Sequence, residues 1–276
     1  MKIIVITVAW NEEKIMDSFL LHYSQFAKKI VVFDNMSDDS TPDIVQRCNI
    51  TELHHFDSHQ KLRDDLNSRI KSEAWLKYDN YDWVICVDSD EFLYHPHIFD
   101  FLEWCEREKI SVVTPRGYDM SPASTFPYSP SNEKNKIPSL KGIGNRLYSK
   151  PIIFSPRRIS QVRFGPGAHS AMYKPEPKIY PNSNSGKVYK VNPFPTSMII
   201  YEESEEQSVP KLLHYRFHGM SDFTQRWKSV DLRRSDINIK NNFGTHYGTS
   251  VETQLNYYDW VVSNTKEIQF QSDFSF

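Results

Sequence analysis

Short apolar runs alternate with amphipathic stretches over the first 95 residues of the chain. Three of these runs are typical of strands buried on both faces, and they span residues 3–8, 30–33 and 84–87. Apolar residues at helical spacing predict helices around residues 15–23, from Thr41 onward, and over residues 61–78. The order strand, helix, strand, helix, helix, strand predicts an α/β fold, in which a parallel sheet carries helices on both faces.

After residue 95 the pattern changes. Most of the 16 prolines lie between Pro115 and Pro210, and long periodic runs are few, which predicts loops and short strands. Further along, we expect a strand over residues 212–218 and helices around residues 223–234 and 251–262. We therefore divide the chain into residues 1–110, residues 111–230 and a helical tail at residues 231–276.

The third apolar run leads directly into three carboxylates, Asp88, Asp90 and Glu91. Side chains two residues apart in a strand share a face, so we expect Asp88 and Asp90 to lie side by side where the strand ends. Neighbouring carboxylates repel each other unless a cation lies between them, and oxygen ligands suit Mg²⁺ or Mn²⁺. The motif predicts a divalent metal that holds a diphosphate, and a solvated acidic turn is the structural alternative.

Polar residues also follow the first two strands, and the ends of parallel strands meet in one crevice. The candidates there are Thr7, Ala9, Asn11 and Glu12 after the first strand and Asp34 after the second. Asn11 is also a good N-cap for the helix that follows it. Asp34 is placed to meet a nucleotide base or ribose, with an ordinary turn residue as the alternative. Arg63, before the acidic strand, is expected to reach a base or phosphate, with a surface position as the alternative.

Composition narrows the choice of partners and compartment. A formal net charge of −2 gives no electrostatic reason to expect nucleic acid as a partner. Three cysteines without metal-ligand spacing favour a reducing compartment. No apolar run approaches the roughly 18 residues that cross a bilayer, and the N-terminus begins with a strand rather than a signal peptide. We expect a cytoplasmic protein without a transmembrane segment, and peripheral membrane association stays open.

Histidines and cations of the second half are further candidates. His169, in a glycine-containing turn, is our first choice for a third metal ligand, ahead of His214 and His218, with a structural histidine as the alternative for each. Basic residues that either contact phosphate or are solvated are Lys141, Arg146, Lys150, Arg157 and Arg158. Aromatic residues that either stack on an acceptor sugar or belong to the core are Tyr118, Phe126, Tyr128, Tyr173 and Trp227.

Four motifs occur in a fixed order along the chain. They are Thr7-Val8-Ala9-Trp10-Asn11-Glu12-Glu13, Asp34-Asn35-x-Ser37-x-Asp39-Ser40-Thr41, Asp88-Ser89-Asp90-Glu91-Phe92-Leu93 and Leu213-His214-Tyr215. Together they resemble the glycosyltransferase family 2-like enzymes of the GT-A fold that carry a D-x-D-E-F signature. The resemblance implies a Rossmann-like nucleotide-binding sheet with an irregular acceptor-binding half.

The resemblance also implies roles for the residues. Residues 1–110 would bind a nucleotide-sugar donor, with Asp34 on the base and Asp88, Ser89 and Asp90 on the ribose and the metal. Residues 111–230 would bind a saccharide or glycolipid acceptor, as in polysaccharide biosynthesis. Family members usually invert the anomeric centre, which requires a carboxylate to act as general base on the acceptor hydroxyl.

That general base has no clear match, because the Glu-Asp pair common in the wider family is absent from the second half. Asp119 is our first candidate, with Glu176 and Asp222 as alternatives. The expected function is an inverting, metal-dependent glycosyltransferase. The alternative is a non-catalytic module that binds a sugar nucleotide or carbohydrate. A nucleotidyltransferase is a third hypothesis, disfavoured because the N-terminus has no glycine-rich phosphate loop.

Overall fold

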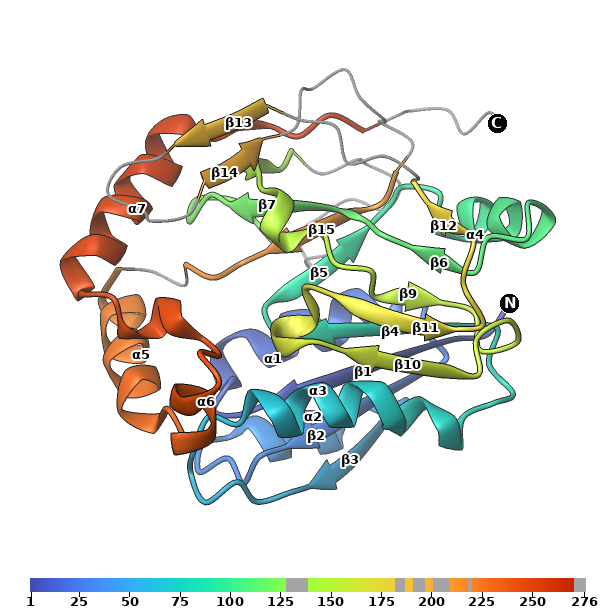
Figure 1. Cartoon of the computed structure of the whole chain (residues 1–276), viewed down its shortest axis with the longest axis horizontal. Coiled ribbons are helices and arrows are strands. Elements are labelled where there is room, and N and C mark those ends of the chain that lie inside the picture. Colours follow the sequence, from blue (N-terminus) through green and yellow to red (C-terminus); the bar gives the residue numbers. More distant parts are fainter. Residues whose placement is uncertain (128–138, 182–186, 191–196, 201–208, 218–219, 271–276) are drawn as a thin grey trace.

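The computed structural model describes residues 1–127, 139–181, 187–190, 197–200, 209–217 and 220–270. Within these residues, two mixed sheets and their flanking helices make up most of the fold (Figure 1). The C-terminal helices lie along one side of the molecule, and helix α4 (Ile98–Arg107) lies on the opposite side. No helix among the described residues is both long enough and apolar enough to cross a membrane.

The first sheet is built on four parallel strands whose order is β4-β1-β2-β3. These strands are β1 (Ile3–Ala9), β2 (Lys29–Asp34), β3 (Thr51–His55) and β4 (Trp83–Asp88). Residues 3–6 of β1 and residues 83–87 of β4 are completely buried, because continuous apolar runs suit a sheet that is covered on both faces. The predicted parallel α/β sheet is therefore confirmed.

Three short strands from later in the chain continue this sheet beyond β4. They are β9 (Ile153–Phe154), β6 (Val112–Val113) and β12 (Ile179–Tyr180), in the order β12-β6-β9-β4. Strand β9 runs antiparallel to both β4 and β6. Strands from both sides of residue 110 therefore share one sheet and one core.

The second sheet has the order β16-β8-β7-β15-β5. Its strands are β5 (Glu91–Tyr94), β7 (Arg116–Met120), β8 (Lys141–Gly144), β15 (Lys211–His214) and β16 (Lys266–Glu267). The chain crosses from β4 in the first sheet to β5 in the second through Ser89 and Asp90 alone. Asp90 therefore lies in the turn between two sheets, whereas strand periodicity predicts it on the same strand as Asp88.

Helices cover the first sheet. They are α1 (Glu13–Ser24), α2 (Thr41–Arg47), α3 (Asp64–Glu73), which η1 (Ala74–Lys77) extends, and α4 (Ile98–Arg107). The expectation that Asn11 caps α1 is wrong, because Glu12 occupies the N-cap position. Asn11 has φ 53° and its side chain bonds to Asp38 instead, with Nδ2 donating to Oδ1 over 2.5 Å. Asn11 thus ties the turn after β1 to the turn after β2.

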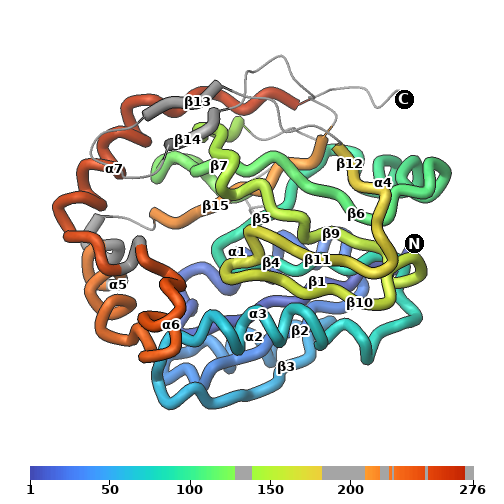
Figure 2. Tube along the Cα trace, viewed as in Figure 1, coloured from blue at the N-terminus to red at the C-terminus, as the bar shows by residue number. Residues whose placement is uncertain are grey.

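Two hairpins and the C-terminal helices complete the fold, and Figure 2 follows the chain along the C-terminal helices α6 and α7. The hairpins pair β10 (Gln161–Phe164) with β11 (Ala171–Lys174) and β13 (Lys187–Lys190) with β14 (Ser197–Ile200). The helical elements are η2 (Arg146–Tyr148), η3 (Pro166–Ala168), α5 (Met220–Arg233), α6 (Asp236–Lys240), η4 (Thr245–Gly248) and α7 (Val251–Asn264). The sequence predicts loops, short strands and two late helices here, and the structure confirms them.

Candidate functional site

A cavity of about 220 Å³ lies where β1, β2 and β4 end. Its lining residues are Val8, Ala9, Trp10, Asn11, Glu12, Asn35, Leu62, Arg63, Asp64, Asn67, Ser68, Lys71, Asp88, Ser89, Asp90, Gly167, Ala168, His214, Val230 and Arg233. Ligands of parallel α/β sheets bind outside the carboxyl ends of the strands, so the cavity has the expected location. Of the predicted residues, the structure brings together Ala9, Asn11, Glu12, Arg63, Asp88, Ser89 and Asp90.

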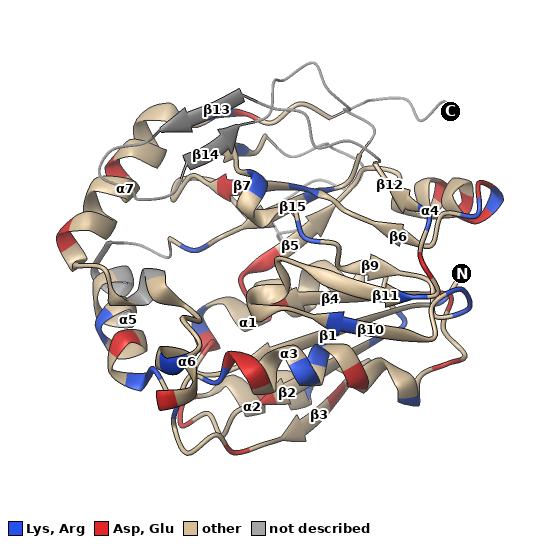
Figure 3. Cartoon of the chain, viewed as in Figure 1, with Lys and Arg blue, Asp and Glu red and all other residues tan. Residues whose placement is uncertain are grey.

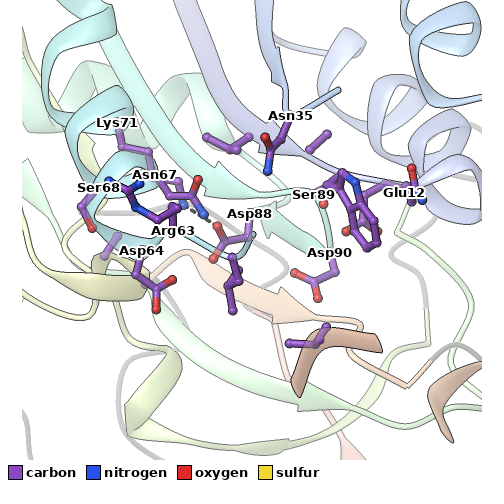
Figure 4. Close-up of a pocket in the computed structure, with 18 of the residues that line it drawn as sticks. Glu12, Asn35, Arg63, Asp64, Asn67, Ser68, Lys71, Asp88, Ser89 and Asp90 are labelled. Atoms are coloured by element: carbon purple, nitrogen blue, oxygen red, sulfur yellow. Dashed lines mark hydrogen bonds and ion pairs between the residues drawn. The ribbon is translucent and has the colours of Figure 1, made fainter. Parts of the chain in front are cut away.

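Helix α3 presents a polar stripe to this cavity. Its members are Asp64, Asn67, Ser68 and Lys71, at the i, i+3, i+4 and i+7 spacing of one helical face. The carboxylates of Asp64, Asp88 and Asp90 project into the same space between α3 and the end of β4 (Figure 4). Along α3, two acidic residues at the start are followed by two basic residues and a final acidic one (Figure 3). The helical spacing of these polar residues is visible in the sequence, and it could have identified them as cavity residues.

Asp88 is held by two lysines. Lys71 Nζ lies 2.5 Å from Asp88 Oδ1, and Lys150 Nζ lies 3.0 Å from Asp88 Oδ2. Lys150 also lies 2.5 Å from Glu91 Oε1, and the Asp88 backbone N–H donates to Glu91 Oε2 over 3.0 Å. Burial opposes ionisation of Asp88, but Lys150 and Lys71 outweigh it and hold the pKa of the carboxyl well below its usual range.

Asp90 faces His214 across the cavity. His214 Nε2 lies 3.5 Å from Asp90 Oδ2, and His214 Nδ1 lies 3.4 Å from Asp119 Oδ1. Burial alone would lower the pKa of His214, but the two carboxylates raise it to about 9. His214, at the end of β15, therefore connects the turn after β4 with a carboxylate of the second sheet.

Asp119 lies outside the cavity. The residue is completely buried on β7, and its carboxylate accepts hydrogen bonds from Tyr257 Oη and, over 2.9 Å, from Asn145 Nδ2. With His214 on its other oxygen, the carboxylate is surrounded by protein groups. This placement suits a residue that orients His214, and it separates Asp119 from any molecule in the cavity.

Asp34 also lies outside the cavity. It is completely buried, and its oxygens accept hydrogen bonds from the backbone N–H and hydroxyl of Ser37, while His55 Nδ1 lies 3.1 Å away. The carboxylate thus closes its own turn, and the next residue, Asn35, lines the cavity instead. Thr7 is likewise completely buried and does not reach the cavity.

His169 does not line the cavity. Its Nδ1 lies 2.6 Å from the Leu147 carbonyl oxygen, and only Gly167 and Ala168 of its turn line the cavity. Gly167 has φ 61°, and a Cβ at this position would lie 2.8 Å from the His169 ring, so the turn requires glycine there. The histidine placed beside Asp90 is His214, the second choice from the sequence, rather than His169.

The remaining candidates fall into four groups. Lys150 belongs to the Asp88 cluster, whereas Lys141 is exposed, Arg157 pairs with Asp82 and Arg158 pairs with Glu106. The described aromatic candidates Tyr118, Phe126, Tyr173 and Trp227 all pack in the hydrophobic clusters. Glu176 is exposed and away from the cavity. Tyr128, His218 and the side chain of Asp222 lie outside the described residues.

The C-terminal helices form the outer wall of the cavity, a contact that the sequence does not predict. The Leu62 N–H donates to the Arg233 carbonyl over 2.7 Å. Asp64 and Asn238 exchange two hydrogen bonds, one from the Asp64 N–H over 3.1 Å and one from Asn238 Nδ2 over 3.0 Å. No local pattern indicates this pairing, because the partners are 174 residues apart in the sequence.

The residues at the cavity fit a divalent cation. Among the described residues, no group of three or more His, Cys, Asp or Glu side chains is arranged to hold a metal ion. Asp90 and His214 nevertheless offer a carboxylate oxygen and an imidazole nitrogen 3.5 Å apart. Mg²⁺ commonly has only one or two protein carboxylates, with phosphate oxygens and water in its other positions, and imidazole is acceptable to Mn²⁺.

Several solved structures are similar to this chain, and no curated protein matches its sequence. TarS 1–349 of S. aureus in complex with UDP-GlcNAc is 14% identical over 96% of this chain and 74% of that chain, with a TM-score of 0.43. The mannosyltransferase PcManGT from Pyrobaculum calidifontis, in complex with GDP-Man and Mn²⁺, is 17% identical over 41% and 35% of the two chains, with a TM-score of 0.33.

A third structure is glucosyl-3-phosphoglycerate synthase from Mycobacterium tuberculosis with Mn²⁺, UDP and glucosyl-3-phosphoglycerate. It is 20% identical over 43% of this chain and 44% of that chain, with a TM-score of 0.31. The chain thus spans less than half the length of the mannosyltransferase and of the synthase.

The family comparison covers the part of the chain that builds the cavity. The model of Glycosyl transferase family 2 matches residues 4–164, more than half of the 276 residues. The match includes the ends of β1, β2 and β4, helix α3 and Lys150. The chain therefore belongs to glycosyl transferase family 2.

Proposed function

We propose that this protein is a metal-dependent glycosyltransferase that moves a sugar from a nucleoside diphosphate donor to a saccharide or glycolipid acceptor, with inversion. The observation that carries the proposal is the location of Asp88, Ser89 and Asp90 in one cavity at the strand ends. Family membership supports the class of reaction. In this proposal residues 1–110 supply most of the donor site, residues 111–230 bind the acceptor, and residues 231–276 close the site.

Asp90 and His214 are the residues that would hold the cation, with Mn²⁺ or Mg²⁺ as the candidates. When bound, the cation supplies Lewis-acid stabilisation of the departing diphosphate. Ligation through His214 Nε2 requires that nitrogen to lose its proton, which the cation's charge favours. Asp119, on the other side of the imidazole, keeps Nδ1 as the protonated nitrogen and so directs Nε2 toward Asp90.

The transfer itself requires three changes at the sugar. The oxygen of the acceptor hydroxyl bonds to the anomeric carbon, the bond from that carbon to the diphosphate breaks, and the hydroxyl proton passes to a carboxylate base. Asp119 is the first candidate for this base from the sequence. Its burial outside the cavity supports a positioning role instead, and the substitution Asp119→Asn separates the two roles.

We also propose a cytoplasmic location and, for a glycolipid acceptor, contact with a membrane surface. Cys48, Cys86 and Cys105 are all free, as suits a reducing compartment. Nucleic acid is not proposed as a partner, since the formal net charge is −2.

Replacing Asp90 tests the proposal. Release of nucleoside diphosphate from a panel of nucleotide sugars would be followed with Mn²⁺ and with EDTA, for the native protein and for Asp90→Asn. We expect EDTA to abolish turnover and Asp90→Asn to lower it by about 100-fold or more, because a charged ligand of the cation is lost. Asp17→Asn, at an exposed site on α1, is the matched control and should turn over normally. Full turnover in EDTA, or in Asp90→Asn, would rule out the metal-dependent mechanism.

The burial of Asp119 also favours the second candidate function, a binding module without catalysis. The same assay separates the two, because a module would bind nucleoside diphosphates and release none from any donor. Binding is measured as thermal stabilisation, since a ligand that binds only the native state raises the apparent stability.

A further inference from the structure

The two aspartates of the acidic motif have different surroundings. Each oxygen of Asp88 lies against an ammonium group, Lys71 on Oδ1 and Lys150 on Oδ2. Asp90 faces His214. We call Lys71, Asp88, Glu91 and Lys150 the Asp88 cluster, and both lysines in it are 3% or less exposed. Buried ammonium groups stay charged only when they are paired with carboxylates. The four groups are therefore a fixed part of the site's structure.

The cluster is electrically balanced, with two ammonium and two carboxylate groups. A divalent cation on Asp88 would therefore lie next to two like charges, and like charges at this range disfavour each other. Lys71 is itself part of the cavity lining. Its positive charge disfavours a cation there and favours an anion such as a diphosphate.

The proposal rests on the function proposed above. We propose that Lys71 and Lys150 are positioning residues that hold Asp88 out of cation ligation, and that the ammonium group of Lys71, which lines the cavity, also contacts the donor's diphosphate. Cation ligation is thereby left to Asp90 and His214. Lys150 comes from the segment between η2 and β9, so the second half of the chain contributes to the donor site.

Lys71→Met is the more informative substitution, because Lys150 still pairs with both carboxylates in that variant. Two affinities would be measured. Mn²⁺ binding, without nucleotide, is followed by electron paramagnetic resonance, and binding of UDP and GDP, in EDTA, is followed by calorimetry. We expect Mn²⁺ to bind about tenfold more tightly, since one oxygen of Asp88 is released and one positive charge is lost. The nucleoside diphosphate that binds the native protein should bind about tenfold more weakly.

The proposal predicts that Mn²⁺ affinity rises while nucleoside diphosphate affinity falls. General damage to the fold would instead weaken both kinds of binding. Lys71→Arg keeps the charge and should therefore change both affinities less than Lys71→Met does. Lys141→Met makes the same change at an exposed position on β8 and should alter neither affinity. Lys150→Met is the second variant, and its two affinities should move in the same directions as those of Lys71→Met. Its thermal stability should be lower, because the buried Glu91 carboxylate loses its cationic partner.

Unchanged Mn²⁺ affinity in Lys71→Met, or a decrease in both affinities, would overturn the proposal. The Mn²⁺ measurement does not depend on the function proposed above. If no nucleotide sugar were turned over but Lys71→Met gained Mn²⁺ affinity, the enzymatic proposal alone would fail. If turnover required Mn²⁺ but Lys71→Met lost Mn²⁺ affinity, only the role proposed for the lysines would be contradicted.

Discussion

At the scale of single residues, His214 joins the cavity to the second sheet. It lies between Asp90 and Asp119, with each carboxylate near one ring nitrogen. Asp119 in turn is fixed by Tyr257 from α7 and by Asn145. A ligand histidine whose other nitrogen is held by a carboxylate has its ring orientation and its basicity set by that carboxylate. Residues of β7, of α7 and at the start of η2 thus determine the direction of the His214 imidazole.

Asp119→Asn separates a positioning role from direct catalysis. Loss of the negative charge should lower Mn²⁺ affinity by about 10- to 100-fold and lower turnover with it, because His214 loses the group that orients it. Both quantities would be measured on the same preparation. Tyr257→Phe, which keeps the charge and removes one donor, is the control and should have a smaller effect. Lost turnover with unchanged Mn²⁺ affinity would return Asp119 to the role of general base.

At the scale of elements, α1 packs across the junction of the two sheets. Tyr23 Oη donates to the Glu91 carbonyl over 2.9 Å and accepts from the Leu93 N–H over the same distance. His22, completely buried on the same helix, has Nε2 2.7 Å from the Leu93 carbonyl. Burial lowers the pKa of His22 to about 3, against a smaller opposing effect of the hydrogen bond to Leu93. The imidazole is therefore neutral in the folded protein.

The buried His22 predicts a dependence of stability on pH. Below about pH 6.5 the unfolded chain binds a proton at His22 that the folded protein binds only near pH 3. Stability is therefore lost as the pH falls through this window, by up to about 1.4 kcal/mol per pH unit. Urea unfolding at about pH 7.5, 6.5 and 5.5, on either side of the ordinary histidine pKa, would compare the native protein with His22→Gln, in which this contribution should vanish. His59→Gln, at an exposed site, should keep the native slope, whereas parallel curves for the native protein and His22→Gln would contradict the prediction.

At the scale of the whole molecule, the first and last parts of the chain close the cavity together. Leu62 and Asp64 at the start of α3 pair with Arg233 and Asn238 of the C-terminal helices. Val230 and Arg233 line the same cavity. Asp64, half-buried near Asp88, has its pKa raised to about 6 by burial and by that neighbouring carboxylate. Docking of the C-terminal helices therefore shapes this edge of the cavity.

Asn238→Ala should weaken that docking. The substitution removes both hydrogen bonds to Asp64 and leaves buried polar groups without partners, so we expect the free energy of unfolding to fall by about 1–3 kcal/mol. Affinity for the nucleoside diphosphate should fall several-fold, because the wall of the cavity is loosened. Chemical denaturation and calorimetry measure the two effects. Asn241→Ala, which removes only an exposed bond to the Ile237 carbonyl, should change neither, and an equal loss in both variants would argue against the docking role of Asn238.

The residues that can be located correctly from the sequence belong to local patterns. The apolar runs of β1, β2 and β4 predict the parallel sheet, and the polar residues at their ends predict the cavity. Asp34, the last residue of β2, and Asn11, in the turn after β1, lie at the predicted strand ends, but the turn geometry decides where their side chains point. Asn35 lines the cavity, whereas the adjacent Asp34, predicted from the sequence, does not. Strand periodicity could not predict this difference, because it does not apply to turns.

The amino-acid sequence by itself determined the strand–helix order, the buried sheet and the acidic motif, because these depend on periodicities of two and 3.6 residues that operate between near neighbours. Only the tertiary structure decided that Lys150 reaches Asp88 across 62 residues and that His214 lies against Asp119 across 95 residues. Such pairs form when separate elements pack around a common core, and no local spacing encodes which elements meet. The sheet and its acidic edge are thus features of segments, whereas the charge balance of the site is a feature of the whole fold.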